Sequence, residues 1–356
     1  MTTRTRARSA TREWSFPTAG ILPPHLLWAI VENGDAAQRA GALQALAVSE
    51  RLRGRRELLG EIATAAAPPG AGKRRTVYDA KHGSQLPGEE ARGEGDPPGN
   101  DVAVNEAYDG AGATYDLYRE VFDRDSIDDR GMPLISTVHY RRGYDNAFWD
   151  GSQMVYGDGD GKIFGRFTKA VDVIGHELTH GVTQYEANLD YADQPGALNE
   201  SLSDVFGSLV KQRKLGQTAE EADWLIGAGL FTAAIRGAAL RSMAAPGTAY
   251  DDPLIGSDPQ PADMAHYVAT ADDNGGVHIN SGIPNRAFYL AAVAIGGCAW
   301  ETAGKVWYVT LRDRLRPASD FKAAAGATVA VAGELFGARG AAAKAVAAAW
   351  KKVGVV

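Results

Sequence analysis

The sequence predicts an α+β protein with a β-rich first half and an α-helical second half, preceded by a small helical unit. Three features of the chain indicate this organisation. Residues 134–156 contain short apolar segments separated by turn residues, which is the pattern of strands. After Lys169 the apolar residues recur at helical spacing almost to the C-terminus. A stretch of small, Pro/Gly-rich and then basic residues, 63–75, has the composition of an exposed linker and separates the front unit from the body.

The front unit is expected to hold two helices within residues 21–62. Residues 21–27 open the first helix, and the pair Asn33-Gly34 ends it. Asp35 is then in position to cap the second helix.

The body begins with an amphipathic helix over residues 102–124. Three strands follow, over residues 134–141, 146–149 and 153–156, and residues 158–161 (DGDG) form a turn after them.

The C-terminal segment 321–350 is rich in alanine, which indicates closely packed helices. The side chains expected on its buried faces are Val329, Leu335, Phe336, Val346 and Trp350.

Composition excludes several classes of protein. The chain has 356 residues, of which 45% are hydrophobic and 23% charged, a balance typical of a soluble protein with a core. Its apolar runs are shorter than the roughly 18 residues that a membrane span needs. No apolar h-region precedes Pro23, so we expect synthesis in the cytoplasm without a signal peptide, with export by a non-classical route left open. Since Cys298 is the single cysteine, a metal must be held by histidine and carboxylate side chains.

The charges are divided unevenly along the chain. Residues 1–75 hold 12 Lys and Arg against 6 Asp and Glu, whereas residues 76–356 hold 25 against 38. The arginines of the front are not interleaved with aromatic residues, and the acidic body would repel a phosphate backbone, so no nucleic-acid partner is expected. We expect the basic front to dock on its own acidic body.

The segment His176-Glu177-Leu178-Thr179-His180 predicts a metal site. Two histidines at i and i+4 project from one face of a helix about 6 Å apart, so both can reach one ion. Glu177 can then contact a metal-bound water. By itself the pattern also fits two unrelated histidines on a solvated helix.

A second helix supplies the missing carboxylates. Glu200 follows His176 by 24 residues, and Asp204 shares its helix face at i+4. Glu200 can be a third ligand and Asp204 can accept the free N–H of a ligating imidazole. Without the histidine pair, Glu200 and Asp204 would be interpreted as two acidic side chains on a solvent-exposed helix face. Two His and one Glu leave the fourth position of a tetrahedral zinc open to water, which is typical of a catalytic site.

A third cluster lies within residues 273–282 (DNGGVHINSG). Asp273 stands five residues before His278, across a Gly-Gly turn, and can hold it in one tautomer or keep it protonated. Together with Tyr191, on the connection between the two metal helices, His278 can donate to an oxyanion. A lone histidine in such a loop can equally be a turn residue.

The segment HELTHGVTQYEANLDYADQPGALNESLSDVFG, residues 176–207, resembles the thermolysin family of zinc endopeptidases. The resemblance covers most of residues 76–356, and its other matching motifs are residues 144–161, 240–243, 273–283 and 321–337. It implies a β-rich half and a helical half joined by the HExxH helix, with a zinc cleft between them.

The resemblance also implies a role for each matched residue. The implied metal ligands and their partners are His176, His180 and Glu200, with Asp204 beside His176 and Asn199 beside His180. Glu177 would be the general base, Tyr191 and His278 the transition-state donors, and Asp273 the residue that orients His278. The implied substrate-binding residues are Asn146 and the Ala147 backbone, Arg241 for a substrate carbonyl, and Phe164, Phe167, Val173 and Leu240 around the S1′ pocket. Cleavage before a bulky apolar residue is therefore expected.

The front unit is similar to the short propeptide of the protealysin-like branch, because it carries Pro23-Pro24-His25-Leu26. That branch folds with its propeptide and removes it by autoproteolysis. The implied domains are 1–72 as helical inhibitory propeptide and linker, 73–185 as β-rich half with the HExxH helix, and 186–356 as helical half, with cleavage inside residues 63–76.

The chain departs from the family at its paired calcium site. Asp172 and Asp223 are retained, but Lys211, Leu225 and Ala228 stand where carboxylates usually do. Ca²⁺ needs six to eight oxygen ligands, so Ca²⁺ binding at a double site is doubtful. Residues 158–161 lack the spacing of an EF-hand loop and are interpreted as a hairpin turn.

Two other functions compete with that of a zinc endopeptidase. One is a zinc-bound, catalytically silent binding module with its prodomain as a permanent ligand; the presence of every catalytic residue argues against it. The other is a nucleophilic hydrolase, which the absence of a G-x-S-x-G motif disfavours. Cys298 lies in an apolar run, where we expect a buried small side chain and not a catalytic nucleophile. Peptide substrates and the chain's own propeptide are the expected partners, and no feature demands a second subunit or a membrane.

Overall fold

The structure, a computed structural model, describes residues 20–63 and 72–356, and for residues 50–63 it describes the backbone only. Its β-rich half contains a five-stranded sheet in the order β2-β1-β3-β5-β4. Pairs β1–β3 and β3–β5 are parallel, and the two outer pairs are antiparallel. The strands are β1 (Arg75–Asp79), β2 (Glu89–Arg92), β3 (Leu134–Val138), β4 (Ala147–Trp149) and β5 (Met154–Tyr156). The three strands expected from the alternating pattern are therefore confirmed.

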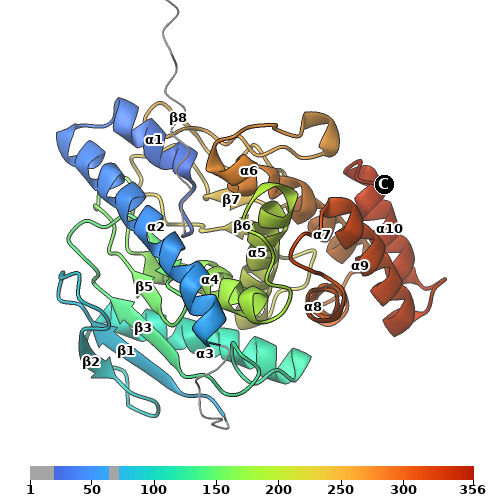
Figure 1. The fold of residues 1–356 in the computed structure, drawn as a ribbon, viewed down its shortest axis with the longest axis horizontal. Helices are drawn as coiled ribbons and strands as arrows, with labels where there is room; N and C mark the ends of the chain where they lie inside the picture. The colour runs from blue at the N-terminus through green and yellow to red at the C-terminus, as the bar shows by residue number, and fades with distance from the viewer. Residues whose placement is uncertain (1–19, 64–71) are drawn as a thin grey trace, which may run out of the picture.

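Helix α3 (Val102–Phe122), which the amphipathic pattern predicted over residues 102–124, contacts β1 and β3 of the sheet. The carboxylate of Asp101 begins the helix by accepting the backbone N–H groups of Ala103 and Val104. After the sheet, α4 (Val171–Tyr185) and α5 (Asp193–Leu215) pack against each other at the middle of the molecule. Figure 1 shows the sheet on one side of this pair and the C-terminal helices on the other.

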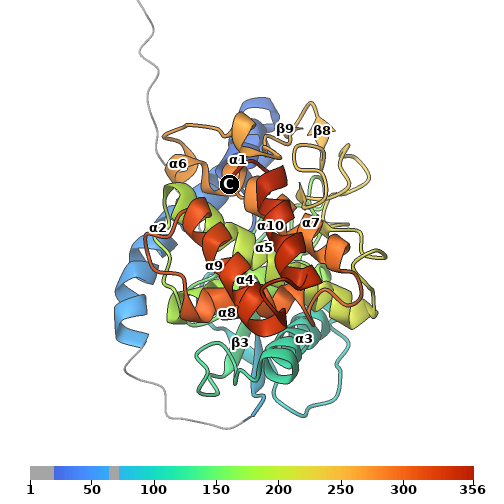
Figure 2. The ribbon, with the colours of Figure 1, turned by 90° about the vertical axis from the view of Figure 1, so that its right-hand side faces the viewer.

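The C-terminal helices are α6 (Asp273–Asn280), α7 (Gly282–Ile295), α8 (Ala303–Asp313), α9 (Phe321–Phe336) and α10 (Ala341–Lys352). Figure 2 shows α8, α9 and α10 forming the outer layer of this half. The α+β class, with a β-rich half followed by a helical half, is confirmed. No helix in the described ranges is long and apolar enough to cross a membrane.

Two sequence predictions about this half are wrong. Residues 217–263 contain no α-helix but irregular chain with the two-residue strands β6 (Leu225–Ile226), β7 (Arg241–Ser242), β8 (Asp251–Asp252) and β9 (Gly256–Ser257), because five glycines and four prolines interrupt the apolar pattern there. Leu335 and Phe336, expected in the core, are 46% and 39% exposed, since α9 ends there and the chain turns toward α10.

The front unit consists of α1 (Pro24–Asn33) and α2 (Ala36–Ala63), as predicted. One oxygen of Asp35 accepts the backbone N–H groups of Ala37 and Gln38 at 2.9 Å each, which confirms the predicted cap. Figure 1 shows both helices lying against the outside of the body. The basic segment of residues 1–19 and most of the expected cleavage region, 64–71, lie outside the described residues.

Candidate active site

His176, His180 and Glu200 meet between α4 and α5 in the interior of the protein. The Nε2 atoms of the two histidines are 3.1 Å apart, and each lies 3.5 Å from an oxygen of Glu200. All three side chains are at most 5% exposed. A tetrahedral zinc ion with bonds of about 2.0–2.1 Å holds its donors roughly 3.3 Å apart, so the three atoms are spaced for one such ion.

Glycines on both helices allow this close approach. A Cβ atom on Gly207 of α5 would overlap the carbonyl oxygen of Asp172, and one on Gly175 of α4 would lie 3.0 Å from the Gly207 Cα. A larger residue at either position would separate the helices. Glu200 on α5 would then move away from the histidines on α4.

The two imidazoles are oriented through their other nitrogens. His176 Nδ1 lies 2.7 Å from Asp204 Oδ1, and His180 Nδ1 lies 2.8 Å from Asn199 Oδ1 and 3.1 Å from Ser203 Oγ. Because a carboxylate and an amide oxygen can only accept, both Nδ1 atoms donate, and both Nε2 lone pairs face the same point. Two lone pairs at 3.1 Å repel each other unless a cation lies between them. The residues present therefore fit Zn²⁺.

Asp204 is fixed by three further donors. Arg241 donates to it through Nε and Nη2 at 2.8 Å each, and Asn285 Nδ2 donates at 2.8 Å. Burial alone would raise the pKa of Asp204, but Arg241 and His176 outweigh burial and lower it below its usual value. Asn285 and Ser203 were missed from the sequence, since neither carries a spacing signal of its own.

Glu200 is ionised in the same environment. Burial raises its pKa, but the electrostatic influence of the neighbouring His278, His180, His176 and Arg241 outweighs burial and lowers the pKa to about 2. Its Oε1 accepts the hydroxyl of Tyr191. Its Oε2 has no hydrogen-bond partner within the described part of the chain, which leaves one carboxylate oxygen available to an ion.

His278 is held in place by Asp273, which accepts His278 Nδ1–H at 2.7 Å and the His278 backbone N–H at 2.8 Å. This arrangement requires the intervening residues 274–276 to adopt left-handed backbone angles, which Asn and two glycines permit. Burial lowers the pKa of His278, but Asp273 and Glu200 raise it to about 9. His278 Nε2 lies 3.4 Å from the Tyr191 hydroxyl and 3.5 Å from Glu200 Oε2. Both predicted donors therefore lie next to Glu200.

Glu177 is fully buried, and its Oε2 accepts the backbone N–H of Trp149 at 2.9 Å. Trp149 is the last residue of β4, so the end strand of the sheet orients the carboxylate that follows the first histidine. This contact has no signal in the sequence, because it is made by a backbone group.

The front unit reaches the candidate site through an extended segment, residues 20–22. Ile21 N donates to Ala147 O at 3.1 Å, Leu22 N donates to Asn146 Oδ1 at 3.1 Å, and Arg241 Nη1 donates to Ile21 O at 3.1 Å. Ile21 and Leu22 are fully buried. The three residues expected to hold a substrate backbone thus hold the backbone of this segment.

Gly20 is required by this close approach. Its φ is +137°, and a Cβ atom there would lie 2.6 Å from Ala147 O. A side chain at position 20 would push the segment away from β4.

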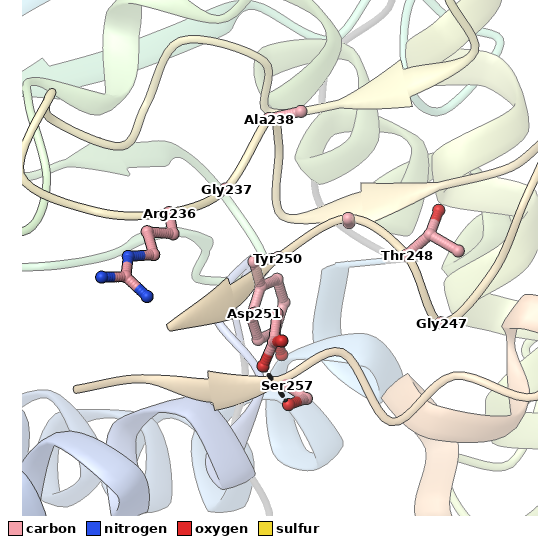
Figure 3. Close-up of a pocket in the computed structure, with 9 residues that line it drawn as sticks. Arg236, Gly237, Ala238, Gly247, Thr248, Tyr250, Asp251 and Ser257 are labelled. Carbon is pink, nitrogen blue, oxygen red and sulfur yellow. Dashed lines mark hydrogen bonds between the residues drawn. The ribbon is translucent and has the colours of Figure 1, made fainter. Parts of the chain in front are cut away.

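Beyond this segment, His25 Nε2 lies 2.9 Å from the hydroxyl of Tyr250. Burial, together with the charges of His278 and Arg241, lowers the pKa of His25 to about 3. Tyr250 also lines a cavity of about 400 Å³. Figure 3 shows its wall, where Ser257 donates to Asp251 at 2.6 Å, and the guanidinium of Arg236 nearby.

The four residues expected around the S1′ pocket are all buried, with at most 1% exposure. Phe164 and Phe167 pack together with ring centroids 5.7 Å apart. Val173 lies on α4, and Leu240 directly precedes β7.

At the other end of α4 and α5, a lysine occupies the region of the expected calcium ligands. Lys211 Nζ lies 2.7 Å from Asp223 Oδ1, 3.0 Å from Leu225 O and 3.4 Å from Asp172 Oδ2. Burial raises the pKa of Asp172, and Lys211 opposes this shift. An ammonium group therefore supplies the positive charge that these oxygens need.

A zinc-fitting set of two histidines and a glutamate, on two helices between a β-rich half and a helical half, is the arrangement of a metallopeptidase. The family model for the thermolysin metallopeptidase catalytic domain matches residues 71–184, and the model for the alpha-helical domain of the same metallopeptidases matches residues 187–355. The chain belongs to the thermolysin family of metallopeptidases.

Full-length relatives extend the similarity to the front unit. The chain is 52% identical over 349 residues to an extracellular metalloprotease of Pectobacterium carotovorum subsp. carotovorum, covering 96% of this chain and 97% of the relative. It is 47% identical to protease PrtS of Photorhabdus sp. (strain Az29), covering 94% and 92%. It also resembles the solved precursor of protealysin, a metalloproteinase from Serratia proteamaculans, with a TM-score of 0.87 and 53% identity over 95% of this chain and 99% of that one.

Proposed function

We propose that this chain is a zinc-dependent endopeptidase synthesised as a self-processing zymogen. The observation that carries the proposal is the buried set of His176, His180 and Glu200, with Glu177 next to the first histidine. Residues 1–72 would be the inhibitory propeptide and linker, 73–185 the β-rich half with the metal-binding helix, and 186–356 the helical half.

His176, His180 and Glu200 would hold the zinc ion, with Asp204 and Asn199 orienting the two imidazoles. Bound Zn²⁺ would supply Lewis-acid polarisation of the scissile carbonyl and a lowered pKa for a water molecule. Glu177 accepts the proton of the attacking water and passes it to the leaving amine. The Trp149 backbone N–H keeps the Glu177 carboxylate in position for both transfers.

The developing oxyanion receives hydrogen bonds from Tyr191 and His278. Asp273 keeps His278 protonated, so that Nε2 carries a hydrogen to donate. Asn146, the backbone of Ala147 and Arg241 bind the substrate backbone through the groups that now bind residues 20–22.

The preference is for a bulky apolar residue after the scissile bond. The residues proposed to form the S1′ pocket, which are apolar and well removed from water, are Phe164, Phe167, Val173 and Leu240. Such a pocket gains free energy by burying an apolar side chain and excludes a charged one.

Residues 20–22 block the cleft because they use the groups that a substrate needs, and the molecule becomes active when it cuts its own linker within residues 63–76. The net positive charge of the front and the net negative charge of the body support docking of the two parts. The ion pair between Lys162 and Asp35 of the front unit, at 3.0 Å, is one polar link between them.

Calcium is not needed at the position of the family's paired site in this proposal, because Lys211 already pairs with Asp172 and Asp223. We also propose that the enzyme acts as a monomer on peptides, without nucleic-acid or membrane partners. It would be synthesised in the cytoplasm and exported by a non-classical route, in keeping with the relative named as an extracellular metalloprotease.

The test is the intact mass and N-terminal sequence of wild-type and Glu177→Ala protein after incubation with zinc. The proposal expects that only the wild type loses about 70 residues, that 1,10-phenanthroline prevents the loss, and that the product cleaves casein. If neither protein is cut and the wild type does not cleave casein, the silent binding module becomes the better description.

A further inference from the structure

A second group of histidine and carboxylate side chains lies at one edge of the sheet. His82 follows β1, His139 follows β3 and Asp158 follows β5. These three strands are neighbours and run parallel, so their carboxyl ends meet at the same edge. The topology therefore brings together three side chains that are spread over 76 residues of the sequence, from His82 to Asp158.

The three side chains are close enough to share one ion. His139 Nδ1 lies 2.9 Å from both oxygens of Asp158, and His82 Nδ1 lies 3.5 Å from Asp158 Oδ2. One potential ligand atom from each residue lies within 4.8 Å of the others. The His82 backbone N–H donates to the His139 carbonyl at 2.9 Å, which holds the two histidines side by side.

The other nitrogen of His139 has a partner that is itself immobilised. Nε2 lies 2.8 Å from Asp101 Oδ2, while Asp101 Oδ1 accepts two backbone N–H groups at the start of α3. A carboxylate behind a metal-binding imidazole fixes its tautomer and raises its basicity. The arrangement repeats the relation of Asp204 to His176 at the active site.

We propose that His82, His139 and Asp158 bind a second divalent ion of the Zn²⁺ class. Two imidazoles and one carboxylate favour such an ion over Ca²⁺ or Mg²⁺, which prefer oxygen ligands. With both histidines neutral, Asp101 and Asp158 carry two negative charges, which a divalent cation balances. The ion joins the turn after β1 to the ends of β3 and β5 and so stabilises this edge of the sheet.

The test is the zinc content of the full chain after equilibrium dialysis against low-micromolar free Zn²⁺, measured by mass spectrometry. All proteins carry Glu177→Gln, so that self-cleavage does not alter the sample. The hydrogen bonds of His139 to Asp158 and Asp101 raise its pKa to about 9, so dialysis is done at mildly alkaline pH, where protons compete less with the metal.

The decisive variant is His82→Asn, because asparagine tolerates the left-handed φ of +60° at this position and the variant should fold. The matched control is His266→Asn, since His266 is an exposed histidine paired with one carboxylate, Asp263, at 2.7 Å. We expect His82→Asn to hold one zinc fewer per chain than its parent, and His266→Asn to hold the same number.

The difference between proteins is the readout, so loss of zinc from the active site would lower every total equally and leave the comparison intact. Equal zinc contents in His82→Asn and its parent would overturn the proposal and leave His139 as an imidazolium between two carboxylates. Thermal unfolding gives a second readout. Added zinc should raise Tm less in His82→Asn and in Asp158→Asn than in the parent, and an equal rise in all three would also overturn it.

Discussion

The two ends of the α4–α5 pair stabilise their buried carboxylates in different ways. At one end, Glu200 and Asp204 are buried beside His176 and His180, whose paired lone pairs require an external cation. At the other end, Asp172 is buried beside Lys211, which brings its own positive charge. A nearby cation stabilises a buried carboxylate; Lys211 supplies it at the Asp172 end, and a metal ion would supply it at the Glu200 end.

One pair of helices can therefore carry a zinc-fitting set at one end and a lysine–carboxylate pair at the other. The end of the pair that carries His176, His180 and Glu200, the metal end, must leave one coordination position of the ion open for a substrate. A lysine there would fill this position. The other end has only to hold the chain in place around Asp172 and Gly227, and an ammonium group does this without an external ion.

The largest expected effect is at the metal end. Replacing Glu177 by Gln should lower kcat/KM by roughly 10²–10⁴-fold, because the amide cannot accept the proton of the attacking water. Zinc content should stay unchanged, since Glu177 is not one of the three ligand residues. Peptide hydrolysis assays, made after an added protease has cut the linker of both proteins, and metal analysis of the same preparation check both parts. A fully active Glu177→Gln enzyme would rule out Glu177 as the base.

The second prediction concerns the residue behind the first imidazole. Asp204→Asn should weaken zinc binding by about 10–100-fold, because the hydrogen-bond partner of His176 loses its charge. Competition with a chelator of known affinity measures the change. Asp258→Asn is the control, since Asp258 is a buried aspartate of the same half that accepts backbone N–H groups. Equal zinc affinities in Asp204→Asn and wild type would contradict the assigned role.

The third prediction concerns the ion pair of Lys211 with Asp172 at the other end of the helix pair. Lys211→Met should lower the free energy of unfolding by about 2 kcal/mol, because Asp172 loses its cation while it remains buried. Urea unfolding of the Glu177→Gln background measures the difference, with Lys214→Met, an exposed lysine of the same helix, as control.

The same site can be tested for calcium. Removal of calcium should leave the stability of the parent unchanged, whereas Lys211→Glu, which restores an oxygen ligand, should gain stability when calcium is added. A parent protein that loses stability in a calcium chelator would show that Lys211 does not replace the ion.

The smallest expected effect is that of pH on the docking of the front unit, through His25. The pKa of His25 is about 3 when docked, against 6.5 as its ordinary value, so docking favours the neutral form. Docking is therefore strongest above pH 6.5 and weakens as the pH falls, by on the order of tenfold between pH 7 and pH 5.

Hydrogen exchange of residues 20–33 in Glu177→Gln protein, corrected for the intrinsic rate, measures this change. His25→Gln cannot become charged and should respond much less to pH. Identical pH dependence in the two proteins would show that another group controls docking.

Local sequence patterns predicted much of the secondary structure correctly. The Asp35 cap, the helix over residues 102–124 and the three strands after it were correct, because each depends on residues that are near neighbours in the chain. The irregular region between α5 and α6 was not foreseen, since its course is determined by contacts such as those of Asp172 with Gly227 and Asp258 with Gly247.

By itself, the sequence determined which chemical groups are available: the histidine pair at i and i+4, the carboxylates of the following helix, and the lysine at a position where the family resemblance implied a calcium ligand. Only the tertiary structure decided what faces them. It brought Trp149 to Glu177, Asn285 to Asp204, residues 20–22 to Arg241, and His82 to His139 and Asp158. The physical reason is that helical spacing is set by neighbouring residues, whereas these contacts join distant segments whose distance depends on the packing of the whole core.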